Sequence, residues 1–237
     1  MITLQPTKLA HLRARRLLAR DALACAGTLE FKPVTSAKWV NIESTSNGGI
    51  RVQIEHDTIR GVTPEMMRWW FENLGGTTMW NGVDFTGPEI THYHLWHHRD
   101  HIAVTRLDPQ RADTRTFAPS ATSRIQEQFN DYNDLIDATV VTTRLDDEEF
   151  NFEIRRYGLT VGRIVHHYSP EPGGLRFYAE TEIGLGFGTR LATVPNLVRP
   201  LLYSRHTAEH WIRHNIEETG RSEDVIPVLY RNAMGIS

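Results

Sequence analysis

The sequence has little of what would cross-link the chain, anchor it in a membrane or bind it to nucleic acid. Its 237 residues include a single cysteine, Cys25, so neither an intrachain disulfide nor a thiolate metal cluster can form. No apolar run is long enough to cross a bilayer. A formal net charge of −3 provides no strongly basic face. We therefore predict a protein without membrane or nucleic-acid partners, in which any metal ion has nitrogen and oxygen ligands.

The N-terminal region also lacks the apolar segment of a signal peptide. Four arginines interrupt the stretch from Leu9 to Cys25. We therefore expect this stretch to be an amphipathic helix of a cytoplasmic protein, and the alternative is an acid-poor presequence. Leucines over residues 6–27 are spaced to give such a helix one apolar side. That side could pack against a second copy of the chain, so a homodimer is one possible oligomeric state.

The rest of the sequence predicts an α+β fold. Thr63 and Pro64 are typical of a helix start, and Gly75 and Gly76 follow its expected end. A long helix is expected from Pro195 to about Thr219, ended by Gly220. Alternating apolar residues and short turns predict a meander of strands. These strands cover residues 39–43, 50–54, 92–96, 139–143, 149–156, 159–168 and 175–183. We expect a helical segment over residues 1–36 and then one domain, residues 37–237, in which a curved antiparallel sheet and the C-terminal helix enclose a cavity.

Histidine is abundant in one short region. Five of the chain's 12 histidines lie within the ten residues from His92 to His101. Neutral imidazole is the commonest ligand of transition metals in proteins, so the density of this cluster favours a metal site. The ordinary alternative is the polar end of a strand with solvated histidines.

The expected C-terminal helix carries a second group of potential ligands. His210, His214 and Glu218 are spaced four residues apart and share one helical face. A His-x-x-x-Glu pair can chelate one ion from a single turn. The same pair could also be solvated on the outer face of the helix, and Glu209 with Arg213 could form a surface ion pair.

Glu127 is the best carboxylate candidate outside this helix. If residues 123–129 form a strand, Glu127 points to the same side as Ile125 and Phe129. A carboxylate among apolar neighbours is costly to bury unless it is paired or bound to a cation.

Several short motifs, taken in order, resemble the phloretin hydrolase and diacetylphloroglucinol hydrolase family. They are Trp96-His97 continuing into Arg99-Asp100-His101, Ile125-Gln-Glu127, Val165-His-His-Tyr168 and His214-Asn-Ile-Glu-Glu218. The chain departs from the family pattern at His98, where a proline is expected. The resemblance, from about Thr63 to the end, implies a helix-grip fold similar to Bet v 1. It also implies a zinc ion, Zn2+, held by His97, Glu127, His214 and Glu218.

The resemblance further implies hydrolysis of a carbon–carbon bond between an acyl group and a phenolic ring. Such a reaction needs a proton donor for the ring. The candidates are His101, His166, His167 and Asp100. The substrate would be a small aromatic molecule, and its pocket needs aromatic walls, although aromatic residues more often belong to the core. Trp69, Trp70, Tyr93 and Tyr178 are the predicted wall residues.

Two other functions fit the same sequence. One is a non-catalytic carrier that binds a hydrophobic ligand in a helix-grip cavity, with incidental histidines. The other is a metal enzyme of another reaction type that uses the same ligands, because ligand identity alone does not fix the reaction.

Overall fold

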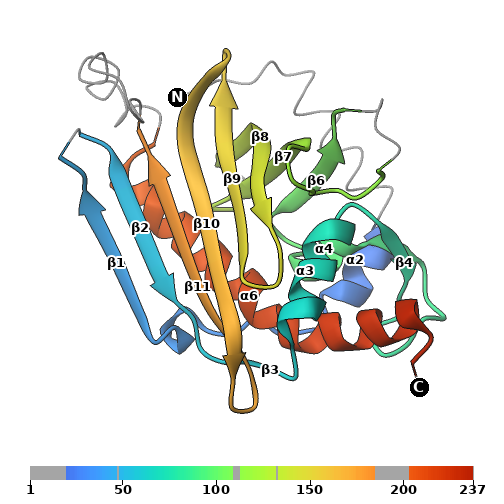
Figure 1. Cartoon of the computed structure of the whole chain (residues 1–237). Coiled ribbons are helices and arrows are strands. Elements are labelled where there is room, and N and C mark those ends of the chain that lie inside the picture. The colour runs from blue at the N-terminus through green and yellow to red at the C-terminus, as the bar shows by residue number, and fades with distance from the viewer. Residues whose placement is uncertain (1–19, 47, 109–112, 132, 185–202, 237) are drawn as a thin grey trace.

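The computed structural model describes residues 20–46, 48–108, 113–131, 133–184 and 203–236, and its main feature is one large antiparallel sheet (Figure 1). Among these residues the strands pair in the order β1-β2-β11-β10-β9-β8-β7-β6, with β3 added at β11. Their bounds are β1 Trp39–Ser44, β2 Ile50–Glu55, β3 Ile59–Arg60, β6 His101–Arg106, β7 Thr122–Phe129, β8 Asp134–Leu145, β9 Glu149–Arg156, β10 Leu159–Glu171 and β11 Gly174–Ile183. A separate hairpin consists of β4, Thr77–Met79, and β5, Glu89–Thr91.

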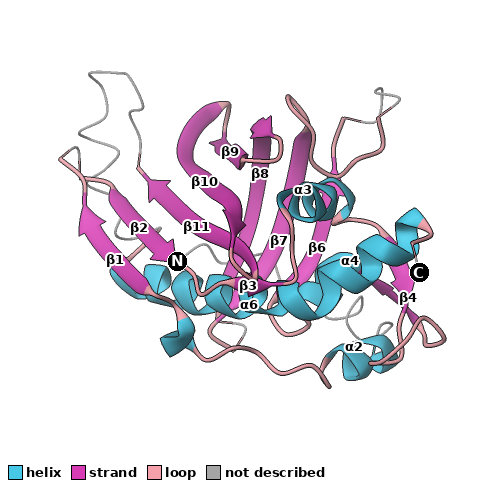
Figure 2. Ribbon diagram, turned by 60° about the horizontal axis from the view of Figure 1, so that its bottom comes forward, coloured by secondary structure: helices cyan, strands magenta, loops and turns pink. Residues whose placement is uncertain are grey.

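The long helix α6, Arg205–Met234, runs across one face of this sheet (Figures 1 and 2). The remaining helical elements are α2 Arg20–Ala26, the short 3-10 helix η1 Val34–Ser36, α3 Pro64–Asn73 and α4 His92–Trp96. Helices α3 and α4 lie together near one end of the sheet and contact α6. The predicted α+β class, a curved antiparallel sheet with a long C-terminal helix in a helix-grip arrangement, is confirmed.

The C-terminal helix is longer than predicted, because Gly220 does not end it. The helix continues through Gly220 and Pro227 and ends at Gly235, which adopts a left-handed conformation with φ of 65°. A Cβ at position 220 would lie 2.9 Å from side-chain carbons of Lys32. The glycine is therefore explained by the close approach of Lys32 rather than by helix termination. The predicted start, at Pro195, lies outside the described residues.

The strand predicted over residues 92–96 is wrong, because this segment is the helix α4. The Thr91 hydroxyl caps it by accepting a hydrogen bond from the backbone N–H of His94, at 3.1 Å. All five residues of α4 are buried. The strand prediction failed because it took the polar histidines for the exposed positions of an alternating, half-exposed strand. The short helix has a consequence for the site: it brings the side chain of Tyr93 and the chain leading to His101 to the same place.

The other predicted elements agree with the structure where it describes them. Helix α3 begins at Pro64 with Thr63 as its N-cap, and the predicted strands overlap β1, β2 and β8 to β11. Of the predicted N-terminal helix, residues 20–26 are helical and residues 6–19 lie outside the described part. No helix in the described ranges is both long and apolar enough to span a bilayer.

Candidate metal centre and cavity

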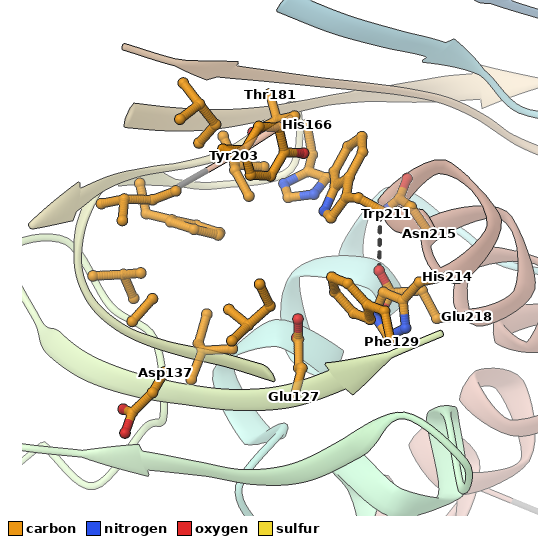
Figure 3. A pocket seen from close by; sticks show the side chains of 18 of the residues that line it. Glu127, Phe129, Asp137, His166, Thr181, Tyr203, Trp211, His214, Asn215 and Glu218 are labelled. Carbon is orange, nitrogen blue, oxygen red and sulfur yellow. Dashed lines mark hydrogen bonds and ion pairs between the residues drawn. The ribbon is translucent and has the colours of Figure 1, made fainter. Parts of the chain in front are cut away.

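A cavity of about 470 Å³ lies between α6 and the inner face of the sheet. Its volume falls within the range typical of small-molecule sites. Aromatic and aliphatic side chains form most of its wall, and Glu127, His214, Asn215 and Glu218 lie together at the end beside α6 (Figure 3). The lining includes Phe71, Tyr93, Trp96, Phe117, Glu127, Phe129, Ile136, Phe150, Phe152, Ile154, Ile164, His166, Tyr203, Trp211, His214, Asn215 and Glu218.

Strand β7 presents Glu127 to this cavity together with Ile125 and Phe129. This is the face that strand alternation predicted. Likewise, α6 turns His214 and Glu218 inward, where 2% and 7% of their surfaces remain exposed. The solvated alternative for the His214–Glu218 pair is therefore excluded.

Three side chains from two elements converge at one end of the cavity. His101, at the start of β6, meets His214 and Glu218, and one ligand atom from each lies within 4.8 Å of the others. The Oε2 atom of Glu218 is 3.2 Å from Nε2 of His101 and 3.6 Å from Nε2 of His214. Glu127 extends the group, because its Oε1 is 3.9 Å from Nε2 of His101.

The ring of His101 is held so that one nitrogen is left for a ligand. Its Nδ1–H donates to the backbone carbonyl of Tyr93 at 2.6 Å, and the ring stacks on that of Tyr93 with centroids 3.6 Å apart. The neutral ring therefore carries its lone pair on Nε2. Nε2 is buried and makes no hydrogen bond to the described part of the chain. An orphaned imidazole lone pair facing two carboxylates is what a divalent cation would satisfy.

The other members of the cluster are oriented in the same manner. Nδ1–H of His214 donates to Oδ2 of Asp100 at 3.2 Å, which turns Nε2 of His214 toward Glu218. Oε1 of Glu218 accepts from the side-chain amide of Asn215 at 2.8 Å, as Figure 3 shows, and leaves Oε2 for the histidines. Such outer partners fix the orientation of metal ligands in proteins.

Glu127 also has an outer partner, because the hydroxyl of Tyr93 donates a short hydrogen bond to its Oε1. Tyr93 therefore serves two members of the cluster, His101 through its carbonyl and Glu127 through its hydroxyl. Burial, followed by the charges of Glu127 and Glu218, raises the pKa of Tyr93 well above its usual value, so the phenol stays protonated.

His97 does not join His101, Glu127 and Glu218, and the predicted ligand set is therefore changed in our proposal below. It belongs to a neighbouring group with Asp100 and His214, and both of its ring nitrogens have protein partners. Nδ1 accepts from the backbone N–H of Asp100 at 3.0 Å, and Nε2–H donates to Glu217 at 3.2 Å. Arg99 contacts both Asp100 and Glu217, and its positive charge makes this neighbouring group a poor place for a cation.

The charges in the cluster are set by burial and by the two carboxylates from β7 and α6. Burial lowers the pKa of His101 to about 3, and the charge of His214 acts in the same direction. Burial also lowers the pKa of His214, but Glu218, Asp100 and Glu127 outweigh it and raise that pKa to about 9. Burial raises the pKa of Glu218 to about 7. The protein alone thus neutralises its buried carboxylates with an imidazolium, which is the charge that a cation would supply instead.

The predicted proton donors have different surroundings. Asp100 is a partner of His214, and His101 belongs to the cluster itself. His166, on β10, lines the cavity beside Tyr203 and Trp211, and its Nδ1–H donates to the carbonyl of Phe150 at 2.9 Å (Figure 3). His167 lies on the other face of β10, half exposed and 3.2 Å from Glu149, so the structure separates it from the cavity.

Of the predicted wall residues, only Tyr93 lines the cavity. Trp70 is fully buried in the core against Trp96, and Trp69 packs on Trp70 and Tyr230. Tyr178 lies on the outer face of β11, where its hydroxyl donates to Glu180. The cavity walls instead come from aromatic residues such as Phe150 and Phe152 of β9, which strand alternation alone could have placed on the inner face.

Neither a protein-family model nor a curated protein matches this sequence. Among solved structures, the di-domain ARO/CYC protein BexL of the BE-7585A biosynthetic pathway is similar over 77% of this chain, at 11% identity and a TM-score of 0.46. The chain spans about half of that protein, 51% of its length. Ara h 8.0201 is similar over 78% of this chain and 99% of its own, at 8% identity and a TM-score of 0.39. A protein of unknown function from Staphylococcus aureus shares 11% identity over 74% of this chain and 96% of its own, with a TM-score of 0.40.

Proposed function

We propose that the chain is a zinc-dependent hydrolase that cleaves the carbon–carbon bond between an acyl group and a phenolic ring. The ligands in this proposal are His101, Glu127, His214 and Glu218. The observation that carries it is the convergence of their ligand atoms at the wall of an apolar cavity, each ligand being held by an outer partner. The order of motifs that resembles the phloretin hydrolase family supports the reaction type.

The donor set fits zinc, since two imidazole nitrogens and carboxylate oxygens are ligands that zinc accepts. Zinc bound there would polarise the acyl carbonyl and make water reactive near neutral pH. In the overall reaction water adds to the acyl carbon, the acyl–ring bond breaks, and the ring carbon takes up a proton. The products are a carboxylic acid and the free phenol.

The chain's own residues would bind and orient the phenolic ring. Phe150 and Phe152 provide apolar contact, while His166 places a titratable group inside the cavity. Because Nδ1–H of His166 is committed to Phe150, its Nε2 is the acceptor. Burial lowers the pKa of His166 to about 4, so the neutral ring can accept a proton from a phenol hydroxyl. Removing that proton helps the ring to reach its keto form, from which the acyl group leaves more easily.

The metal requirement is tested on the purified full chain by elemental analysis, beside the single variant His214→Ala. We expect one zinc ion per chain in the wild type and a loss of roughly 100-fold or more in zinc affinity in the variant, because a ligand and not only an outer partner is removed. Asn232→Ala, an exposed position in the last turn of α6, is the matched control. A wild type without bound metal, or a variant that keeps it undiminished, would refute the site.

The reaction is tested with a panel of acylated phloroglucinols and dihydrochalcones, followed by chromatography of the free phenol and acid. We expect turnover that stops on chelation and returns with zinc. If the protein binds metal but turns over no member of the panel, the proposed metal site stands and the proposed substrate class is refuted.

A second candidate function, a carrier of a hydrophobic aromatic molecule, is favoured by the volume and apolar lining of the cavity. It predicts undiminished ligand binding after chelation and no turnover. Ala138 and Thr139 provide a matched pair of positions on β8, because Ala138 lines the cavity and its neighbour lies on the opposite face. We expect Ala138→Phe to weaken binding of a fluorescent aromatic probe at least 10-fold through lost volume, and Thr139→Phe to leave it unchanged. Equal affinities would place the probe outside the cavity.

A further inference from the structure

The orientation of Glu218 depends on a side chain that is not adjacent to the metal cluster. Oε1 of Glu218 accepts from Nδ2 of Asn215, and Asn215 in turn offers its Oδ1 to Nε2 of His56 at 3.1 Å. All three side chains are buried, with 7%, 2% and 3% of their surfaces exposed. The three form one hydrogen-bonded row from the end of β2 to the cluster.

The row has a defined direction because an amide has one accepting and one donating end. Oδ1 of Asn215 carries no hydrogen, so His56 must donate through Nε2–H. With Oδ1 engaged, the amide presents Nδ2–H to Glu218. The reversed amide would set its oxygen against the carboxylate oxygen of Glu218, which is repulsive when Glu218 is ionised. The Nε2–H of His56 therefore pairs with the amide orientation that favours an ionised Glu218.

His56 itself is also held by the sheet. It directly follows β2, its backbone N–H donates to the carbonyl of Phe177 on β11 at 3.0 Å, and its ring packs edge-on against the ring of Phe177. The imidazole thus has a set position relative to the sheet. Through Asn215 it ties one face of α6 to that position at the turn that carries His214 and Glu218.

We propose that His56 is a positioning residue that acts through Asn215 to hold Glu218 with Oε2 directed at His101 and His214. The inference rests on the proposed metal site and adds to it a part of the chain, the end of β2, that none of the sequence motifs includes. Its effect is on the affinity for the ion, because an unheld carboxylate must be ordered when the ion binds.

Two substitutions separate the hydrogen bond from the packing of the ring. His56→Leu fills similar space without a donor, whereas the amide nitrogen of His56→Gln can replace Nε2 as a donor to Asn215. The affinity of the full chain for Zn2+ and for Co2+ is measured by competition with a chelator. His206→Gln, an exposed position at the start of α6, controls for loss of a histidine. Thermal unfolding of each metal-free variant reports whether it is folded.

We expect His56→Leu to weaken Zn2+ and Co2+ binding roughly 10-fold, the lower end of the range for lost outer partners of metal ligands. We expect His56→Gln to recover most of that loss and His206→Gln to match the wild type. Wild-type affinity in a folded His56→Leu overturns the positioning role. Equal weakening in both His56 variants also overturns it, since packing would then be the cause. A wild type that binds neither ion refutes the proposed metal site itself, which is a distinguishable result.

Discussion

Replacing His101 by alanine is expected to cause the largest loss of metal affinity of any single change in this chain. The substitution removes the only buried ring nitrogen of the cluster that makes no hydrogen bond within the described residues, and it leaves Glu127 and Glu218 facing each other without the nitrogen that separates them. The expected loss exceeds the 10- to 100-fold typical of lost outer partners. Chelator competition and elemental analysis measure it.

His97→Ala is the matched comparison, because His97 lies four residues earlier and is equally buried. We expect this variant to keep its zinc ion and to lose about 1–3 kcal/mol of unfolding free energy, since Glu217 and the backbone N–H of Asp100 would each lose a partner. Urea unfolding of the metal-free protein checks the second effect. The reverse outcome, with zinc lost from His97→Ala and kept by His101→Ala, would restore the ligand set that the sequence motifs implied.

The proposal of His101 in place of His97 as a ligand rests on contacts that sequence motifs do not provide. Both histidines belong to the same short motif, Trp96 to His101, and the motif does not say which ring nitrogen is free. That depends on the turn after α4, where the carbonyl of Tyr93 engages Nδ1 of His101 while the N–H of Asp100 engages Nδ1 of His97. Such backbone contacts are set by the tertiary fold and leave no sequence signal.

Spacing was more informative for residues on regular elements. The inward face of β7 and the shared helical face of His214 and Glu218 follow from strand and helix periods, and both were predicted. The i,i+3 spacing of Asn215 and Glu218 could have revealed their hydrogen bond as well. His56 could not have been found in this way, because 159 residues separate it from Asn215 and the two meet only in the tertiary fold.

The remaining large effect concerns Arg221, a fully buried guanidinium that joins the N-terminal segment to α6. Its NH1 donates to the carbonyl of Ala26 at 2.8 Å and its NH2 to the carbonyl of Leu29, and the group lies 4.3 Å from the ring centre of Phe31. The Phe31 ring stacks in turn on His97, with centroids 4.4 Å apart. Arg221 therefore holds residues 26–31 against α6 and beside His97, whose ring in turn contacts that of His214.

We expect Arg221→Met to lower the free energy of unfolding by about 2 kcal/mol, since the methionine fills much of the space but donates no hydrogen bond. The half-buried carbonyl of Leu29 loses its Arg221 partner, and the carbonyl of Ala26 keeps only the backbone N–H of Leu29. Burial lowers the pKa of Arg221 to about 10, and removing that costly charge offsets part of the loss. Arg231 is an exposed arginine in the last turn of the same helix. Arg231→Met should change the free energy of unfolding by less than about 0.5 kcal/mol. Urea unfolding of both variants, with hydrogen exchange of residues 26–31, measures the difference. Equal stability of the two variants would mean that the packing of Phe31, and not the guanidinium, holds the N-terminal segment against α6.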